Sequence, residues 1–145
     1  MSTKRSVVLR GQPEFNEYGA ATEAIKPGYL VKGVSSLAKQ TATTGYYAFA
    51  LAIERGELGQ GIDNVAGNGV LAASYAIGDT VKVGVFDAGD EATVWIASGE
   101  NIVEDDLLES AGNGLFKEGA TRPTCRAMET VGHVAVETAL RVQVI

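Results

Sequence analysis

The acidic residues of segment 84–95 (GVFDAGDEATVW) are the first candidates for chemistry. Asp87, Asp90 and Glu91 lie close together, and clustered carboxylates could bind a metal ion or act as an acid and a base. A calcium loop of the EF-hand type needs oxygen ligands at fixed alternating positions between two helices. A glycosidase needs two carboxylates that face each other across a cleft. The alternating residues on both sides of this segment predict a hairpin instead, in which the acids form the turn.

The other candidates for catalysis are the single cysteine and the single histidine of the chain. Cys125 is followed by Arg126, whose charge would favour a thiolate, and His133 is the one residue that could serve as its base. A small hydrolase built on this pair remains an alternative. A zinc site would need several His or Cys ligands. The glycines of 67–72 (GNGVLA) lack the preceding strand and following helix of a dinucleotide-binding fingerprint. We therefore expect no enzyme, no metal site and no cofactor.

Composition restricts the class of protein further. The chain has 145 residues, of which 46% are hydrophobic, with 18 glycines and a net charge of −6. This composition suits one folded domain with many tight turns between short strands. Nucleic acids are bound by concentrated positive charge, and the scattered Lys and Arg residues predict no such partner. No stretch has the length of a membrane span, so we expect a protein that is made soluble in the cytoplasm.

The elements that must position these residues are strands, because period-two alternation dominates the chain. In segment 46–54 (YYAFALAIE) the large residues alternate with alanines, which places them on one face of a strand. Trp95 lies in a similar run and is expected in the core. Asn113-Gly114 predicts a type I′ hairpin that pairs 107–110 with 115–117. Segment 100–110 (ENIVEDDLLES) could form one or two helical turns.

Two segments fall outside this pattern. Residues 1–24 have little periodicity and are expected to form an extended N-terminal arm. Residues 54–76 form a long loop rich in glycine and alanine, and such loops are usually functional. We therefore expect an all-β protein, a small single-domain antiparallel β-sandwich or barrel-like fold over residues 25–145, with the arm and the loop available for contacts.

Several of these segments together resemble the capsid decoration, or head-cementing, proteins of tailed bacteriophages. The resemblance covers residues 23–145, and its main motifs are 57–63 (ELGQGID) and 78–91 (GDTVKVGVFDAGDE). The insertion at 64–74 (NVAGNGVLAAS) and the longer N-terminal arm depart from the pattern.

The resemblance implies a structural virion protein that binds the outer surface of the assembled capsid and stabilises it. The partners would be the major capsid protein and further copies of the chain, most simply in a homotrimer. The arm and the loop would supply the contacts, which are expected at Lys4, Arg5, Arg10, Leu58, Gln60 and Ile62. The alternative is a carbohydrate-binding β-sandwich, displayed on a virion or secreted, that uses Trp95 and exposed tyrosines.

Overall fold

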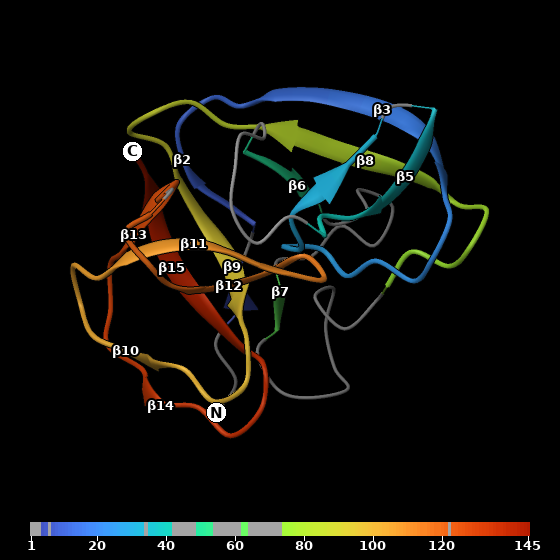
Figure 1. Cartoon of the computed structure of the whole chain (residues 1–145). Helices are drawn as coiled ribbons and strands as arrows, with labels where there is room; N and C mark the ends of the chain where they lie inside the picture. The colour runs from blue at the N-terminus through green and yellow to red at the C-terminus, as the bar shows by residue number, and fades with distance from the viewer. Residues whose placement is uncertain are drawn as a thin grey trace.

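The computed structural model describes residues 4–5, 7–33, 35–41, 49–53, 62–63, 74–121 and 123–145. All regular secondary structure within these residues is β, and none of it is helical (Figure 1). The all-β fold class predicted from the sequence is therefore correct. The strands are β1 (Lys4–Arg5), β2 (Val8–Arg10), β3 (Glu14–Ala21), β4 (Val31–Lys32), β5 (Ser36–Lys39), β6 (Ala50–Ala52), β7 (Ile62–Asp63), β8 (Thr80–Val85), β9 (Glu91–Ile96), β10 (Asn101–Ile102), β11 (Leu107–Gly112), β12 (Leu115–Glu118), β13 (Cys125–Ala127), β14 (Gly132–His133) and β15 (Thr138–Val144).

The first large sheet closes on itself. Its strands run in the order β12-β11-β13-β15-β9-β2, and β12 also pairs in parallel with β9 through Phe116 and Ile96. This additional pairing joins five strands into a small barrel, against which β2 is added at β9. The larger cluster of buried side chains draws on all five barrel strands, with Val94, Leu108, Phe116 and Leu140 fully buried.

The second large sheet has the order β4-β5-β3-β8-β6 and lies beside the barrel (Figure 1). Leu30, which immediately precedes β4, forms a bridge with Leu51 of β6. The two edges of the sheet therefore approach each other, and the sheet curls around a second cluster that includes Ile25, Leu37 and Val83.

Strand β6 and the residues on either side of it contribute to both clusters, and the large residues lie on one face as the alternation predicted. Phe49, Leu51 and Ile53 belong to the larger cluster, whereas Ala50 and Ala52 belong to the second. The large residues of a strand lie on one face and the small residues on the other. In this strand both faces are buried, so the alanines leave room for the second cluster to pack closely.

The hairpin predicted at Asn113-Gly114 is confirmed. Strands β11 and β12 pair antiparallel, with Ser110 opposite Phe116, and the turn residues Asn113 and Gly114 have φ values of 54° and 76°. Positive φ at both central residues is the signature of a type I′ turn. The local sequence is sufficient to specify this hairpin.

Segment 84–95 contains the predicted turn but not the predicted hairpin. Gly89 has a φ of 95°, and the Asp90 carboxylate accepts a hydrogen bond from the Asp87 amide at 3.0 Å. The acids therefore do form the turn. The flanking strands β8 and β9 belong to different sheets, however, since β8 pairs with β3 and β6 whereas β9 pairs with β15 and β2. The helical turns considered for 100–110 are also absent, because residues 103–106 form a turn between β10 and β11.

The described residues of segment 1–24 do not form the expected extended arm. Residues 14–21 form β3, which lies between β5 and β8 in the second sheet, and Val7 is fully buried. Strand β3 was missed because its sequence, EFNEYGAA, has no regular alternation of apolar and polar residues. Hydrogen bonds from strands on both sides hold it instead. Of the predicted loop at 54–76, only 62–63 and 74–76 lie within the described residues.

Candidate functional site

A row of polar side chains crosses four strands on the outer face of the barrel. Arg10 of β2 pairs with Glu91 of β9, Glu91 pairs with Gln143 of β15, and Gln143 pairs with Arg126 of β13. Directly opposed residues of adjacent strands project to the same face. Their neighbours Val142 and Val144 are buried, so the row itself faces outward. Arg141 lies two residues before Gln143 on the same face. We call Arg10, Glu91, Arg126, Arg141 and Gln143 the arginine row.

The Arg126 guanidinium is held in the row by two side chains. Its Nη2 atom donates to Gln143 Oε1 at 2.7 Å, and its Nη1 atom donates to Asp105 Oδ1 at 3.1 Å. Two bonds to one planar group fix its orientation. The Arg126 side chain nevertheless keeps 42% of its surface exposed, so its outer edge remains available to a ligand.

The other arginines of the row are more open. The Arg10 side chain is 78% exposed, and its Nη1 atom lies 3.6 Å from Oε2 of Glu91, whose side chain is only 13% exposed. Arg141 is also exposed, and its backbone amide donates to Glu129 Oε1 at 3.0 Å. Exposed ion pairs of this kind contribute little stability, so an external anion can compete for these guanidiniums. Arginine forks match the geometry of phosphate and carboxylate groups. The row can therefore bind anions but offers no nucleophile.

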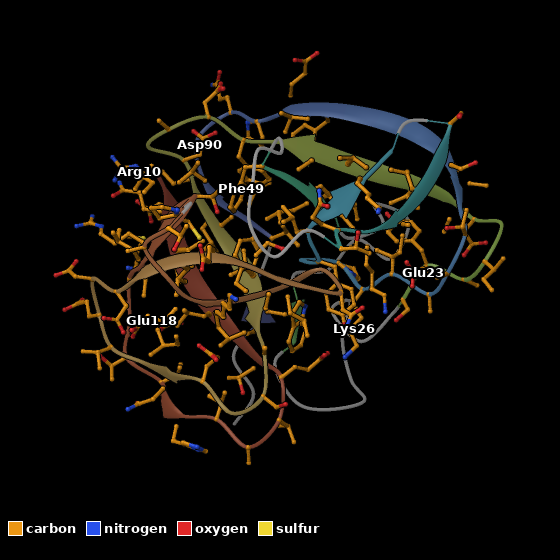
Figure 2. All side chains as sticks on the ribbon, viewed as in Figure 1. Arg10, Glu23, Lys26, Phe49, Asp90 and Glu118 are labelled. Atoms are coloured by element: carbon orange, nitrogen blue, oxygen red, sulfur yellow. The ribbon has the colours of Figure 1, made fainter. Side chains whose placement is uncertain are left out.

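A second polar cluster lies where the barrel meets the second sheet. The Lys26 ammonium lies 2.5 Å from Glu137 Oε1 and 4.8 Å from the centre of the Trp95 ring. The Tyr29 hydroxyl donates to the same carboxylate at 2.9 Å, and its ring meets Trp95 edge-on. We call Lys26, Tyr29, Trp95 and Glu137 the junction cluster. It joins the turn before β4 to the start of β15, and Figure 2 labels Lys26 far from Arg10 in that view.

Trp95 occupies a different position from the one its sequence predicts. Its neighbours Val94 and Ile96 are fully buried, whereas Trp95 is partly buried on the opposite face of β9 and packs against both hydrophobic clusters. The indole N–H donates to the Pro27 carbonyl at 2.9 Å. Gly28 has a φ of 95°, and a Cβ there would lie 3.1 Å from the indole, so only glycine fits this contact.

The pKa of Tyr29 is raised above its usual range, first by burial and then by the Glu137 carboxylate that its hydroxyl contacts. Folding thus favours the protonated phenol. An ordinary tyrosine titrates near pH 10, so the unfolded chain loses this proton before the folded chain does. We expect the free energy of unfolding to fall as the pH rises above about 10. Urea unfolding at pH 8 to 11 measures this fall, which should be smaller in Tyr29→Phe; equal slopes in the two proteins would contradict it.

Most of the contact residues predicted from the sequence lie apart from these two clusters. Strands β1 and β7 pair with Lys4 opposite Asp63 and Arg5 opposite Ile62. The structure thus brings three of the predicted residues into one short ribbon. Leu58 and Gln60 lie outside the described residues. Arg10 is the one predicted residue that belongs to the arginine row.

Sequence reasoning missed the other members of the row, although a signal was present. Apolar and polar residues alternate in the last segment of the chain, 131–145 (VGHVAVETALRVQVI), and Arg141 and Gln143 are among the polar ones. This alternation placed them on an outward face, but only the strand pairing shows that Arg126 and Arg10 lie beside them.

The hydrolase alternative finds no support in the two residues it needs. Cys125 is fully buried in the barrel, and burial raises the pKa of its thiol far above the usual range. His133 is exposed on β14, a strand of a separate two-stranded sheet. A buried neutral thiol is a poor nucleophile. Within the described residues no three His, Cys, Asp or Glu side chains come together as a metal site, and no helix could cross a membrane.

The described fold and the arginine row can now be compared with known proteins. No protein-family model matches the chain. The large ribosomal subunit protein uL1 of Frankia alni is 34% identical over 122 residues, which cover 81% of this chain and 51% of that protein. The uL1 protein of Mycobacterium leprae is 32% identical over 109 residues, 74% of this chain and 46% of that protein. The uL1 protein of Mycobacterium ulcerans is 31% identical over 122 residues, which cover 81% of this chain and 52% of that protein. The chain spans about half the length of the curated relatives it matches.

These similarities correct the function expected from the sequence. The relatives are ribosomal proteins and not phage decoration proteins, so the resemblance to that family is wrong. The capsid-stabilising function, its carbohydrate-binding alternative, the capsid and homotrimer partners and the virion location are wrong with it. The expected absence of a nucleic-acid partner is overturned as well, because a ribosomal subunit consists of RNA and protein. The expectation that the chain is not an enzyme agrees with these relatives, which are ribosomal subunit proteins.

Proposed function

We propose that this chain is a non-enzymatic β-domain that associates with the large ribosomal subunit and contacts RNA phosphates through the arginine row. The observation that carries the partner is the similarity to uL1, which reaches 34% identity over 122 residues. The chain corresponds to about half of such a protein, so the association is proposed for this domain's own surface.

The arginine row supports the manner of binding. Phosphate contacts are made by Arg and Lys side chains and fix the position of a protein on RNA without reading its sequence. Arg10, Arg126 and Arg141 provide three guanidiniums on one outward face, and the first two are 78% and 42% exposed. The net charge of −6 does not prevent this, because binding depends on the local field of a surface.

Co-sedimentation with purified mycobacterial ribosomal subunits tests the proposal. The wild-type chain should sediment with large subunits, and small subunits measure non-specific binding. Replacing Arg10, Arg126 and Arg141 together by alanine should weaken the association by at least tenfold. Loss of three phosphate contacts should also reduce the slope of log affinity against log salt by about 2 to 3.

A matched control separates the row from general charge. Replacing Lys32, Lys82 and Lys117 by alanine also removes three positive charges, but from strands outside the row. This control should bind large subunits nearly as well as the wild type. Equal losses in the two triple variants would rule out the arginine row as the contact surface. Failure of the wild-type chain to prefer large subunits would rule out the proposed partner.

A further inference from the structure

The junction cluster lies where the barrel and the second sheet meet, beside the apolar contact between them. One buried cluster fills the barrel and also takes in Leu30, Leu51 and Ile53 from the side of the second sheet, and the other cluster lies within the curled second sheet. Trp95 is one of the few side chains that pack against both. Opposite Trp95 the turn presents Gly28, which has no side chain to add to this contact.

We propose that Glu137 is a latch, whose carboxylate holds the 26–29 turn of the second sheet against the barrel and can release it without unfolding either core. The inference is independent of the proposed function. It concerns the opening of one junction and names the side chain that controls it.

The carboxylate satisfies both polar groups that the turn directs toward the barrel. Its Oε1 atom lies 2.5 Å from the Lys26 ammonium and accepts from the Tyr29 hydroxyl at 2.9 Å, and its Oε2 atom lies 3.0 Å from the same hydroxyl. Loss of the charge on Glu137 would leave the Lys26 ammonium without its counter-ion. The Tyr29 hydroxyl would also lose its charged acceptor, and hydrogen bonds to charged groups contribute more to stability than neutral ones.

The remaining polar links across the junction are weaker than this contact. The indole of Trp95 donates to Pro27, and the Leu30 amide donates to the Gly114 carbonyl at 3.0 Å. These are single neutral hydrogen bonds, which contribute less to stability than hydrogen bonds to a charged group. The neighbouring ammonium of Lys39 lies 5.9 Å from the Tyr29 ring centre but pairs with Glu23 at 3.5 Å. Glu137 is thus the one carboxylate that the described residues place on Lys26.

The latch is placed where water and ions reach it. The side chains of Lys26 and Glu137 are 33% and 28% exposed. Proteins open locally, at a lower free energy than global unfolding, where the contacts that hold a segment are exposed to solvent. The junction should therefore open before the barrel does, and opening should expose the edge of Trp95.

Glu137→Gln tests the latch, because it removes the charge and keeps the size of the side chain. Trp95 is the only tryptophan of the chain, so its emission reports directly on the junction. We expect a red-shifted emission maximum. We also expect hydrogen exchange at least tenfold faster at the Gly28 and Leu30 amides, with unchanged exchange at Leu140 and Val142 in β15.

Two further variants make the result decisive. Lys26→Met should reproduce both changes, because it removes the other half of the ion pair. Glu23→Gln removes a charge from the nearby pair with Lys39 and should leave the Trp95 emission unchanged. Unaltered emission and exchange in Glu137→Gln would overturn the proposal. Faster exchange that is uniform over all strands would overturn it too, because it would show that the junction and the barrel open together.

Discussion

Replacing Phe116 by alanine is expected to lower the free energy of unfolding by about 4 kcal/mol. Phe116 is fully buried, its backbone pairs with Ile96 where the barrel closes, and its ring lies 5.6 Å from that of Phe49. Truncation of a buried phenylalanine removes its transfer free energy and leaves a cavity, at a cost of about 3–5 kcal/mol. Here the cavity would lie at the closing pair of strands, where the backbone has little freedom to collapse into it. Urea unfolding followed by circular dichroism measures the loss.

Phe15→Ala provides the matched control for this substitution. Phe15 also lies on a strand but is 47% exposed, with the Lys82 ammonium 4.8 Å from its ring centre. The same change of side chain should cost about 1 kcal/mol or less at this position. Similar losses at the two positions would show that Phe116 is not a core residue of the barrel and that β12 does not close it.

The strands themselves could be predicted because their signal is local. The alternation of 46–54 placed Phe49, Leu51 and Ile53 together, and all three lie in the larger cluster. The turn at Asn113-Gly114 was equally local, since positive φ at two successive residues restricts the residue types that fit. Side-chain period and turn chemistry act over a few residues, and a single sequence displays them directly.

The pairing of the strands could not be predicted in the same way. The turn at 87–90 has the residues of a hairpin, yet β8 pairs with β3 and β6 while β9 pairs with β15 and β2. A turn fixes only the direction of the chain, and the partner of each strand depends on buried area contributed by distant segments. Strand β3 shows the same limit, because its place in the sheet is decided by its neighbours and not by its own alternation.

The arginine row was hidden for this reason. Arg10 and Arg126 are 116 positions apart in the sequence and come into one row through three strand pairings. Counting charges along the chain gave scattered basic residues and a net charge of −6. The distribution of charge on a surface depends on which strands lie side by side, so composition alone led to the wrong conclusion about nucleic acid.

The mistaken family resemblance has a related physical origin. Its main motifs were a glycine-containing loop and the block 78–91, in which a Gly-Asp turn precedes alternating valines. In the structure the Asp79 carboxylate accepts from the Ala76 amide, and Asp90 and Asp106 form the same bond in their own turns. Such turns serve any compact β-domain with short connections. They therefore report how the chain turns and do not identify what it binds.

Replacing Trp95 by alanine is expected to lower the free energy of unfolding by about 3 kcal/mol, close to the loss at Phe116 although Trp95 is only partly buried. Its ring packs against both hydrophobic clusters, so truncation weakens the junction as well as one face of the barrel. The hydrogen bond to Pro27 is lost, and the Lys26 ammonium, 4.8 Å from the ring centre, loses the nearer of its two aromatic contacts. These contributions are about 1 kcal/mol each, and loss of the packed ring supplies the remainder.

Trp95→Phe separates the packing from the polar contacts, because it keeps an aromatic ring but removes the indole N–H. We expect this variant to lose about 1–1.5 kcal/mol.

The losses in Trp95→Ala and Glu137→Gln should not be additive, since both substitutions act on Lys26. The double variant should lose less stability than the two single losses together. Urea unfolding of the wild type, the two single variants and the double variant, followed by circular dichroism at one pH, gives this comparison. A loss below about 1 kcal/mol in Trp95→Ala would show that the two clusters are held together elsewhere. Strict additivity with Glu137→Gln would show that Trp95 and the carboxylate stabilise the fold through separate contacts.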